Sequence, residues 1–288
     1  MSTYKIIVLG GSGFLGSHII QALHRSGISK VTCGDVIEQN SLNCDFVKLD
    51  ILDDYDIMKT LKGYDTVINC TGQITTPFNL CFHLNSTGVN NLAKAISGED
   101  TRLIQISTVA MYGTAENCNE ESPLNPETSY ATAKAFAEQI LLNNCDHQQL
   151  TILRLSNLYG SHQAKGIIAY LLRSYHSDRK LNFNNDGTLV RFFMHVEDCA
   201  DIIAEVVKNS KLTGIFNVKG HETYSVKELL QQFENHFSVI FEKSFNQRLP
   251  WENINSLDDS KLRSTIDIQP RWQIFDFFEK ELGNQIYA

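Results

Sequence analysis

Short apolar runs alternate with amphipathic stretches along the first 160 residues of the chain. The apolar runs are four or five residues long and rich in β-branched side chains, as in strands buried on both faces of a sheet. They fall at Lys5–Leu9, Lys30–Gly34, Asp45–Leu49, Thr66–Asn69, Leu103–Ser107 and Leu150–Arg154. Helical periodicity covers 14–23, 53–61, 79–96 and 129–143. This alternation predicts an α/β fold, a doubly wound parallel sheet of the Rossmann type.

The alternation weakens after about Ser161, where short strands, helices and polar loops follow one another. One later segment repeats the earlier pattern, with an apolar-periodic helix over Val196–Val207 and a strand-like run over Gly214–Val218. We therefore predict a Rossmann domain over 1–160 with 191–218 returning to it. A smaller, mainly C-terminal lobe over 161–190 and 219–288 is expected to cover the cleft and bind the substrate.

A glycine motif follows the first strand directly, because residues 10–16 read GGSGFLG and a helical pattern begins near Phe14. In this strand–turn–helix context Gly10 permits a tight turn, Gly13 lets the backbone approach a pyrophosphate, and Gly16 allows close packing. The first-turn N–H groups, including those of Phe14 and Leu15, and the helix dipole attract the anion. The motif predicts a dinucleotide-binding site.

Asp35 ends the second predicted strand, about twenty residues beyond the glycines. A carboxylate at this place can accept hydrogen bonds from both ribose hydroxyls of NAD. No Arg or Lys occurs between Asp35 and Lys48 to bind a 2′-phosphate. The predicted cofactor is therefore NAD, with NADP less favoured.

Composition limits the partners. The formal net charge of −8 argues against nucleic acid or an anionic membrane as the main partner. No apolar run reaches membrane-spanning length and the N-terminal residues lack the features of a signal sequence, so a cytoplasmic location is expected. The seven cysteines are scattered without a CxxC pair, which predicts buried thiols and no metal site.

Tyr130 and Lys134 are four residues apart in the predicted helix 129–143, which puts a phenol and an ammonium on one face. A nearby cation favours the phenolate and brings a group of pKa about 10 into range for proton transfer. Taken alone, the spacing also fits a half-buried tyrosine beside a solvated lysine. Thr108 stands just after the strand that ends at Ser107, at the edge where such sheets bind ligands.

Together these motifs resemble the extended short-chain dehydrogenase/reductase family, especially its nucleotide-sugar epimerase, dehydratase and reductase branch. The resemblance covers almost the whole chain. It rests on the glycine motif, on Thr108 and on the Tyr-x-x-x-Lys spacing. Further matching segments are Asn85–Leu92, Leu153–Gly160, Arg191–Asp198 and Gly214–Val218.

The resemblance implies that Thr108, Tyr130 and Lys134 are the catalytic residues. Tyr130 would exchange a proton with the substrate oxygen while hydride moves between that carbon and nicotinamide C4, and Thr108 would hydrogen-bond the same oxygen. Lys134 would lower the pKa of Tyr130 and hold the nicotinamide ribose. Counting back from Tyr112-Gly113 assigns the hydroxyl to Thr108 rather than Ser107.

Further binding residues are implied in the same way. Asp50 and Ile51 resemble the pair that contacts adenine, and Thr71 with Gly72, at the end of the fourth strand, is expected at the cofactor. Asn157 would contact the sugar diphosphate and Arg191 the diphosphate or nucleoside base, although a turn cap and a surface charge are the alternatives. Relatives dimerise through the two long helices, here about 79–96 and 129–143, so a homodimer is expected.

The residues after Thr108 narrow the reaction. Nucleotide-sugar 4,6-dehydratases carry an Asp-Glu pair there, whereas this chain has Val109 and Ala110, neither of which can transfer a proton. We expect reduction of a 4-keto-(6-deoxy)hexose, carried by a nucleoside diphosphate, at C4. A 4-epimerase with tightly held NAD is the alternative. A reductase of a non-nucleotide alcohol or ketone and a redox-inactive NAD-binding protein are further alternatives.

Overall fold

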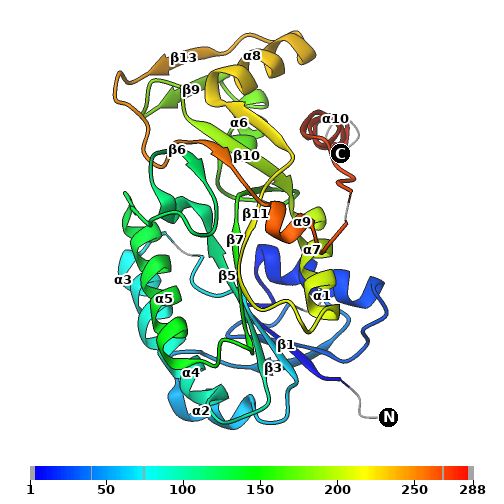
Figure 1. Cartoon of the computed structure of the whole chain (residues 1–288). Coiled ribbons are helices and arrows are strands. Elements are labelled where there is room, and N and C mark those ends of the chain that lie inside the picture. The colour runs from blue at the N-terminus through cyan, green and yellow to red at the C-terminus, as the bar shows by residue number, and fades with distance from the viewer. Residues whose placement is uncertain (1–3, 40, 74, 268, 285–288) are drawn as a thin grey trace.

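A seven-stranded parallel sheet forms the larger part of the protein (Figure 1). The computed structural model describes residues 4–39, 41–73, 75–267 and 269–284. The strand order is β11-β7-β5-β4-β1-β2-β3. The strands are β1 (Ile6–Leu9), β2 (Val31–Asp35), β3 (Asp45–Lys48), β4 (Thr66–Asn69), β5 (Arg102–Thr108), β7 (Leu150–Leu155) and β11 (Gly214–Val218). The predicted doubly wound Rossmann sheet is confirmed.

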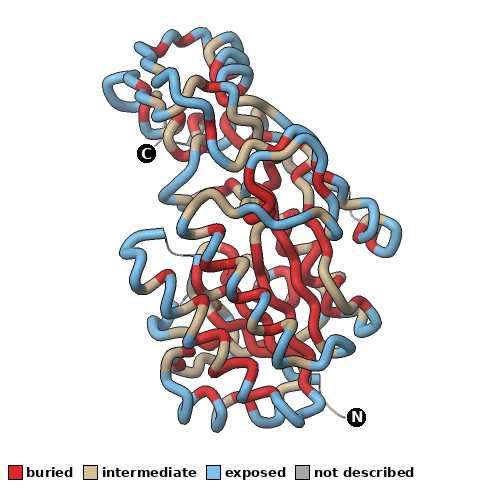
Figure 2. The backbone as a smooth tube through the Cα atoms, turned by 60° about the vertical axis from the view of Figure 1, so that its left-hand side comes forward, coloured by how far each residue is buried: buried red, intermediate tan, exposed pale blue. Residues whose placement is uncertain are grey.

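Helices cover both faces of this sheet because alternate strand residues point to opposite sides. In β1, Ile6 and Val8 pack in the core under α1 and α7, whereas Ile7 and Leu9 pack in the core under α2, α4 and α5. Buried residues run through the middle of the body, and exposed residues lie on the outer sides of the helices and in the loops (Figure 2). The helices are α1 (Phe14–Arg25), α2 (Asp54–Thr60), α4 (Val89–Ile96), α5 (Ser129–Asn144) and α7 (Val196–Lys208).

The helix predicted over 79–96 is a continuous helical run with a π-helical turn inside it. α3 (Phe78–His83) leads into the π-helical turn Leu84–Gly88, and α4 follows at once. At this turn the Asn85 amide donates to the carbonyls of Gly72 and Cys81. Asn85 thus bonds both the preceding turn of its own helical run and the loop after β4, at the place where the helix widens.

A smaller lobe lies above the sheet (Figure 1). Its core is largely aromatic and includes Phe233, Phe241, Phe277 and Phe278. Its elements are β8 (Asn157–Tyr159), α6 (Ile167–Tyr175), β9 (Lys180–Phe183), β10 (Val190–His195), β12 (Glu222–Ser225), α8 (Val226–Phe237), β13 (Glu242–Phe245) and α10 (Ile274–Asn284). β10 pairs with β8 and β12, so of the predicted returning segment 191–218 only β11 joins the large sheet as a strand.

A two-stranded sheet connects the C-terminal part of the chain to the segment after β5. β14 (Ile254–Leu257) runs parallel to β6 (Ala115–Cys118), which follows the 3₁₀ turn Val109–Tyr112, and the short helix α9 (Ser260–Arg263) comes next. The segment just before β14 therefore lies close to the residues after β5. Within the described ranges, no helix has the length and apolar character needed to cross a membrane.

Candidate active site

The glycine motif forms a tight turn from β1 into α1. Gly10 has φ +73°, a left-handed conformation that favours glycine. A Cβ on Gly16 would lie 2.2 Å from the Gly10 carbonyl oxygen, so no larger residue fits there. Gly13 is the N-cap of α1 and has no side chain to cap the helix. The N-cap residue therefore does not occupy the first-turn N–H groups, which include those of Phe14 and Leu15. This backbone geometry fits a dinucleotide pyrophosphate.

Asp35 lies beside this turn, as predicted from its position at the end of β2. Gly10 N–H donates to the Gly34 carbonyl at 2.8 Å, which joins the two strand ends. One carboxylate oxygen of Asp35 accepts from Ser12 N–H at 3.0 Å and the other from Val36 N–H at 2.7 Å. The carboxylate is half-buried at the edge of the turn, where a ribose would follow the pyrophosphate.

The next two strand ends carry the other residues expected at the cofactor. Asp50, just after β3, is exposed and accepts from Leu52 N–H at 2.9 Å, whereas Ile51 is buried and contacts the π-helical turn. Thr71 and Gly72 follow β4, and the Thr71 carbonyl accepts a hydrogen bond from Lys134. The structure therefore brings these residues to the carboxyl edge of the sheet.

Lys134 lies wholly inside the protein between α5, β4 and β5. Its Nζ donates to the carbonyl of Thr71 at 3.1 Å and to that of Ile106 at 3.3 Å, and its side chain is 0% exposed. Burial lowers the pKa of Lys134 to about 8, against the opposing effects of Cys70, Cys81 and Glu138. The solvated lysine considered as the alternative is excluded by this burial.

Tyr130 is half-buried one turn before Lys134, and its hydroxyl donates to the side-chain carbonyl of Gln73. Burial raises the pKa of Tyr130 above its ordinary value, and the nearby Cys81 and Glu252 raise it further. The expected lowering of this pKa is therefore not what the structure gives. The reason is that desolvation outweighs the hydrogen bond that Tyr130 donates to Gln73, while the Lys134 ammonium is bonded to backbone carbonyls.

The structure separates the two hydroxyls at the end of β5. Ser107 is 2% exposed, and its Oγ donates to Glu138 Oε1 at 2.5 Å. Thr108 is half-buried, and its Oγ1 accepts from Ala110 N–H at 3.2 Å. Of the two, only Thr108 retains access to a ligand, which agrees with the assignment from Tyr112-Gly113.

Asn157 and Arg191 both lie on the three-stranded sheet of the lobe. Asn157 is exposed and pairs with Phe193 across β8 and β10. Arg191 is partly buried, and its Nη1 donates to the carbonyls of Val190 at 3.0 Å and Glu252 at 2.8 Å. Burial lowers the pKa of Arg191. The guanidinium is thus held in the protein, unlike a surface charge.

Three residues at this site were not found from the sequence. Gln73 bonds Tyr130, Glu252 bonds the N-cap Thr128 of α5 at 2.5 Å, and Glu138 bonds Ser107. Glu138 stands four residues after Lys134, so the same helical spacing that singled out Tyr130 could have found it. Gln73 and Glu252 lie in irregular segments whose positions no periodicity predicts.

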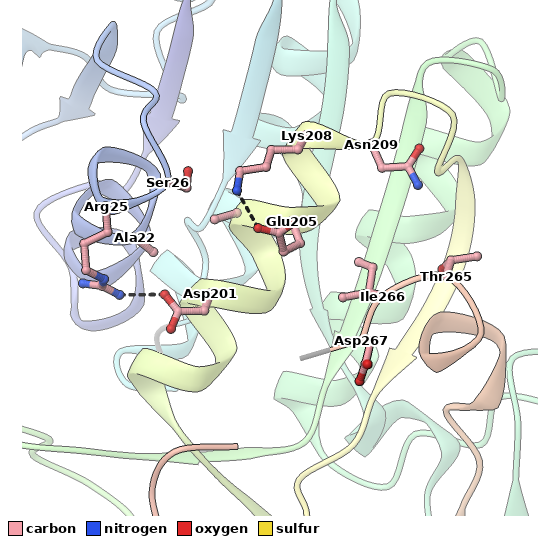
Figure 3. Close-up of a pocket in the computed structure, with 11 residues that line it drawn as sticks. Ala22, Arg25, Ser26, Asp201, Glu205, Lys208, Asn209, Thr265, Ile266 and Asp267 are labelled. Atoms are coloured by element: carbon pink, nitrogen blue, oxygen red, sulfur yellow. Dashed lines mark hydrogen bonds and ion pairs between the residues drawn. The ribbon is translucent and has the colours of Figure 1, made fainter. Parts of the chain in front are cut away.

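A cavity of about 610 Å³ lies elsewhere, between the C-terminal half of α1, α7 and residues 265–267 (Figure 3). None of the predicted site residues lines it. Its Arg25 is paired with Asp201 at 2.7 Å and its Lys208 with Glu205 at 2.6 Å. Among the described residues no group of three or more His, Cys, Asp or Glu is placed to hold a metal ion.

A family model described as "NAD dependent epimerase/dehydratase family" matches residues 6–218, which include the glycine turn, Thr108, Tyr130 and Lys134. The chain belongs to this family. The resemblance seen in the motifs is thereby confirmed, and members of this family that match the chain are nucleotide-sugar dehydratases, epimerases and reductases.

The curated relatives span more than one reaction. A UDP-glucose 4-epimerase of Lactobacillus helveticus is 25% identical, over 94% of this chain and 94% of its own. The human dTDP-D-glucose 4,6-dehydratase is 26% identical, over 79% of this chain and 72% of its own. A trifunctional plant enzyme of Arabidopsis thaliana, which includes a UDP-4-keto-L-rhamnose reductase, is 27% identical over 91% of this chain. The chain covers only 44% of that enzyme.

Solved structures show the same fold. The UDP-glucuronic acid 4-epimerase of Bacillus cereus, in complex with UDP-glucuronic acid and NAD, superposes with a TM-score of 0.84 at 24% identity, covering 98% of this chain and 100% of that one. The dTDP-glucose 4,6-dehydratase of Bacillus anthracis, in complex with NAD, gives 0.84 at 20% identity, covering 99% and 97%.

Proposed function

We propose that this protein is an NAD-dependent oxidoreductase that reduces the 4-keto group of a nucleoside-diphosphate-linked (6-deoxy)hexose. The observation that carries the proposal is the arrangement at the end of β5. Lys134 of α5, one turn after Tyr130, bonds the Ile106 carbonyl two residues before Thr108, and the two positions after Thr108 hold no acid. Such a site can handle one oxygen and has no further acid or base in that turn for an elimination.

We propose Gly10, Gly13, Phe14, Leu15 and Gly16 as the cofactor's pyrophosphate site and Asp35 as its ribose acceptor. Asp50, Ile51, Thr71 and Gly72 would complete that site. The left-handed Gly10 and the excluded Cβ at Gly16 support a close backbone approach to phosphate. When bound, the nicotinamide dinucleotide supplies the hydride. The half-buried Asp35 carboxylate, with no Arg or Lys in the sequence between it and Lys48, favours NAD over NADP.

Tyr130 is proposed as the proton donor. Its raised pKa keeps the phenol protonated at neutral pH, which is the form that a carbonyl reduction needs. Thr108 is proposed to donate a hydrogen bond to the same substrate oxygen. Lys134 is proposed to stabilise the phenolate that remains and to hold the nicotinamide ribose. Asn157 and Arg191 are proposed for the sugar diphosphate and the base, in accord with the phosphate-binding chemistry of a guanidinium.

The 3₁₀ turn after Thr108 supports reduction over 4,6-dehydration. Val109 is 7% exposed and packs with Tyr112 and Phe192, so this position serves the core. Ala110 uses its N–H to bond Thr108. Neither residue can move a proton between C5 and C6, although 4,6-dehydratases are among the relatives of this chain.

A 4-epimerase is the second candidate, because a UDP-glucose 4-epimerase matches 94% of this chain along 94% of its own length. Epimerisation would use Thr108, Tyr130 and Lys134 in both directions and would need the keto sugar to turn over within the site. It would leave the total NADH unchanged, whereas a reductase consumes one NADH for each product.

Two measurements test the proposal. Thermal-shift screening with NAD and with UDP-, dTDP-, GDP- and CDP-sugars should show stabilisation by NAD and by one nucleotide class. Stabilisation by NAD alone would contradict a nucleotide-sugar substrate and point to a non-nucleotide ketone. NADH oxidation with a nucleotide-linked 4-keto-6-deoxyhexose, followed by NMR of the product, should give a reduced C4. Interconversion of 4-hydroxy sugars without NADH consumption would identify the epimerase instead.

We also propose that the protein is a homodimer that pairs α3–α4 and α5 with those of a second copy. Phe82 and Phe136 stack in parallel with their ring centroids 6.4 Å apart, and each is almost half-exposed, as is Phe78. Large apolar groups left at a helical surface are typical of an interface. Sedimentation at micromolar concentration should give twice the monomer mass, and a monomer would contradict the pairing.

The two parts of the molecule are proposed to bind different ligands. We propose that 1–160 with 191–218 binds NAD and that 161–190 with 219–288 binds the substrate, with Asn157 of β8 and Arg191 of β10 reaching the substrate from the three-stranded sheet of the lobe.

A further inference from the structure

A buried carboxylate lies directly behind the proposed catalytic residues. Glu138 is on α5 one turn beyond Lys134 and is 2% exposed. Its Oε1 accepts from Ser107 Oγ at 2.5 Å, and Arg154 of β7 donates to it from Nε at 3.2 Å and from Nη2 at 2.7 Å. Glu138 therefore ties the helix that carries Tyr130 and Lys134 to two strands of the sheet.

The network continues away from the active site. Arg154 Nη1 donates to Tyr112 Oη at 2.8 Å, and Tyr112 donates to Asn217 Oδ1 at 2.8 Å. Ser107, Arg154, Tyr112 and Asn217 are each 3% exposed or less. A buried polar network in which every member is bonded holds its elements in one arrangement. The fixed element here is the end of β5, where Thr108 is the next residue after Ser107.

Glu138 also bears on the charge of Lys134. The ammonium is buried and bonded to two neutral carbonyls, of Thr71 and Ile106. Burial lowers the pKa of Lys134, while Glu138 on α5, Cys70 at the end of β4 and Cys81 on α3 act in the opposite direction. Burial raises the pKa of both thiols, so they are neutral at pH 7. Among these groups only Glu138 is a carboxylate, and Arg154 pairs with it at 2.7 Å.

We propose that Glu138 is a positioning residue of this active site. Its carboxylate fixes the end of β5 against α5 through Ser107 and lies one helical turn from the buried Lys134 ammonium. The effect on turnover rests on the proposed function, whereas the effect on Lys134 can be measured without substrate or cofactor.

The direct test is an NMR titration of Lys134 in protein labelled with ¹³C at lysine Cε. The Lys134→Arg variant identifies the signal by its loss. In the wild type Lys134 should titrate near 8, well below the exposed lysines. In Glu138→Gln its pKa should fall by about one unit, the lower end of the effect of a nearby charge. Tyr112→Phe is the control. It removes a hydroxyl from the same network on the far side of Arg154 and should leave the pKa of Lys134 unchanged.

Glu138→Gln leaves Arg154 buried without its partner, which can unfold the protein. If that variant does not fold, Glu138→Gln/Arg154→Met replaces it, because this pair removes both charges together. The Lys134 pKa should again fall but by less, because removal of the Arg154 cation acts in the opposite direction to removal of Glu138. An unchanged Lys134 pKa in the folded variant overturns the proposal. Glu138→Asp keeps the charge and should restore the Lys134 pKa.

The pH dependence of kcat distinguishes the effect of the Glu138 charge on Lys134 from its effect on the position of β5. At pH 8, kcat of Glu138→Gln should fall about fivefold, and the alkaline fall of kcat should begin about one pH unit earlier. Ser107→Ala should lower kcat equally at every pH, because it removes only the link to the strand. A shifted Lys134 signal in a protein that reduces no 4-keto sugar would reject the proposed function and leave the role of Glu138 intact.

Discussion

Asn85 and Gly72 are in direct contact at the carboxyl edge of the sheet. The Asn85 amide donates to the Gly72 carbonyl at 3.0 Å, and a Cβ on Gly72 would lie 2.7 Å from that amide. Gly72 has φ +76°. Asn85 thus holds the turn at Gly72. The carbonyl of the preceding residue, Thr71, accepts the hydrogen bond from the Lys134 ammonium. The π-helical turn is therefore linked to the proposed catalytic lysine through one backbone segment.

This contact predicts that Gly72→Ala is more destabilising than the left-handed backbone alone explains. Gly98 has φ +77° and nothing within 4 Å of its Cβ position, so Gly98→Ala is a matched control. We expect a loss of about 1 kcal/mol in the free energy of unfolding for Gly98→Ala and about 1–2 kcal/mol more for Gly72→Ala. Urea denaturation measures both. Equal losses of unfolding free energy would show that Asn85 moves aside without destabilising the protein.

Asp35→Ala should weaken NAD binding by at least about tenfold, because the ribose hydroxyls lose a charged acceptor. NADP binding should change little or improve, since the carboxylate no longer repels a 2′-phosphate. Calorimetry with both dinucleotides measures this. Unchanged NAD affinity would contradict the proposed ribose contact of Asp35.

Tyr130→Phe should leave NAD binding intact and lower turnover by about two to four orders of magnitude, the usual contribution of a positioned proton donor. Tyr55→Phe is the control, because Tyr55 is 74% exposed on α2. Steady-state rates with NADH and the substrate found by the thermal-shift screen provide the comparison. A Tyr130→Phe rate near that of the wild type would remove Tyr130 from the mechanism.

Glu222 should make stability depend on pH. Burial raises the pKa of Glu222 to about 7, while its carboxylate accepts from Ile274 N–H at 2.8 Å at the start of α10. Between pH 4.5 and 7 the folded state therefore binds more protons than the unfolded state, so stability falls as pH rises through this window. His221, Tyr159 and Asp276 face the same carboxyl.

The comparison with Glu222→Gln, which does not titrate, isolates this effect. From pH 4.5 to 7.5 the wild type should lose up to about 3 kcal/mol in free energy of unfolding relative to the variant. Glu242→Gln is the control, because the Glu242 side chain is 74% exposed. Parallel pH profiles for the wild type and Glu222→Gln would contradict a raised pKa.

The fold was predictable because most strands of the large sheet are short apolar runs that alternate with helices of clear period. The strand ends then placed Gly10, Asp35, Thr71 and Thr108 at one edge without further information. Contacts between elements distant in sequence were not predictable. The bond from Thr128 to Glu252 crosses 124 residues, and nothing in the local pattern marks Glu252.

The pKa of Tyr130 was predicted in the wrong direction for a similar reason. The helical spacing put Lys134 beside Tyr130 but could not show that Lys134 is wholly buried and Tyr130 half-buried. Burial raises the pKa of Tyr130 and lowers that of Lys134, and its extent depends on β4, β5 and residues 71–73 packing over α5. The pairing of β10 with β8 and β12 was missed because the apolar run over 190–195 has no feature that assigns it to one sheet.

One turnover with NADH carrying deuterium at both C4 positions of the nicotinamide, and with a nucleotide-linked 4-keto-6-deoxyhexose, tests the proposed reduction most directly. The proposed reductase predicts one NAD formed per product and deuterium at C4 of the sugar, seen by NMR. Deuterium at another sugar carbon, or product formed without net oxidation of NADH, would contradict it.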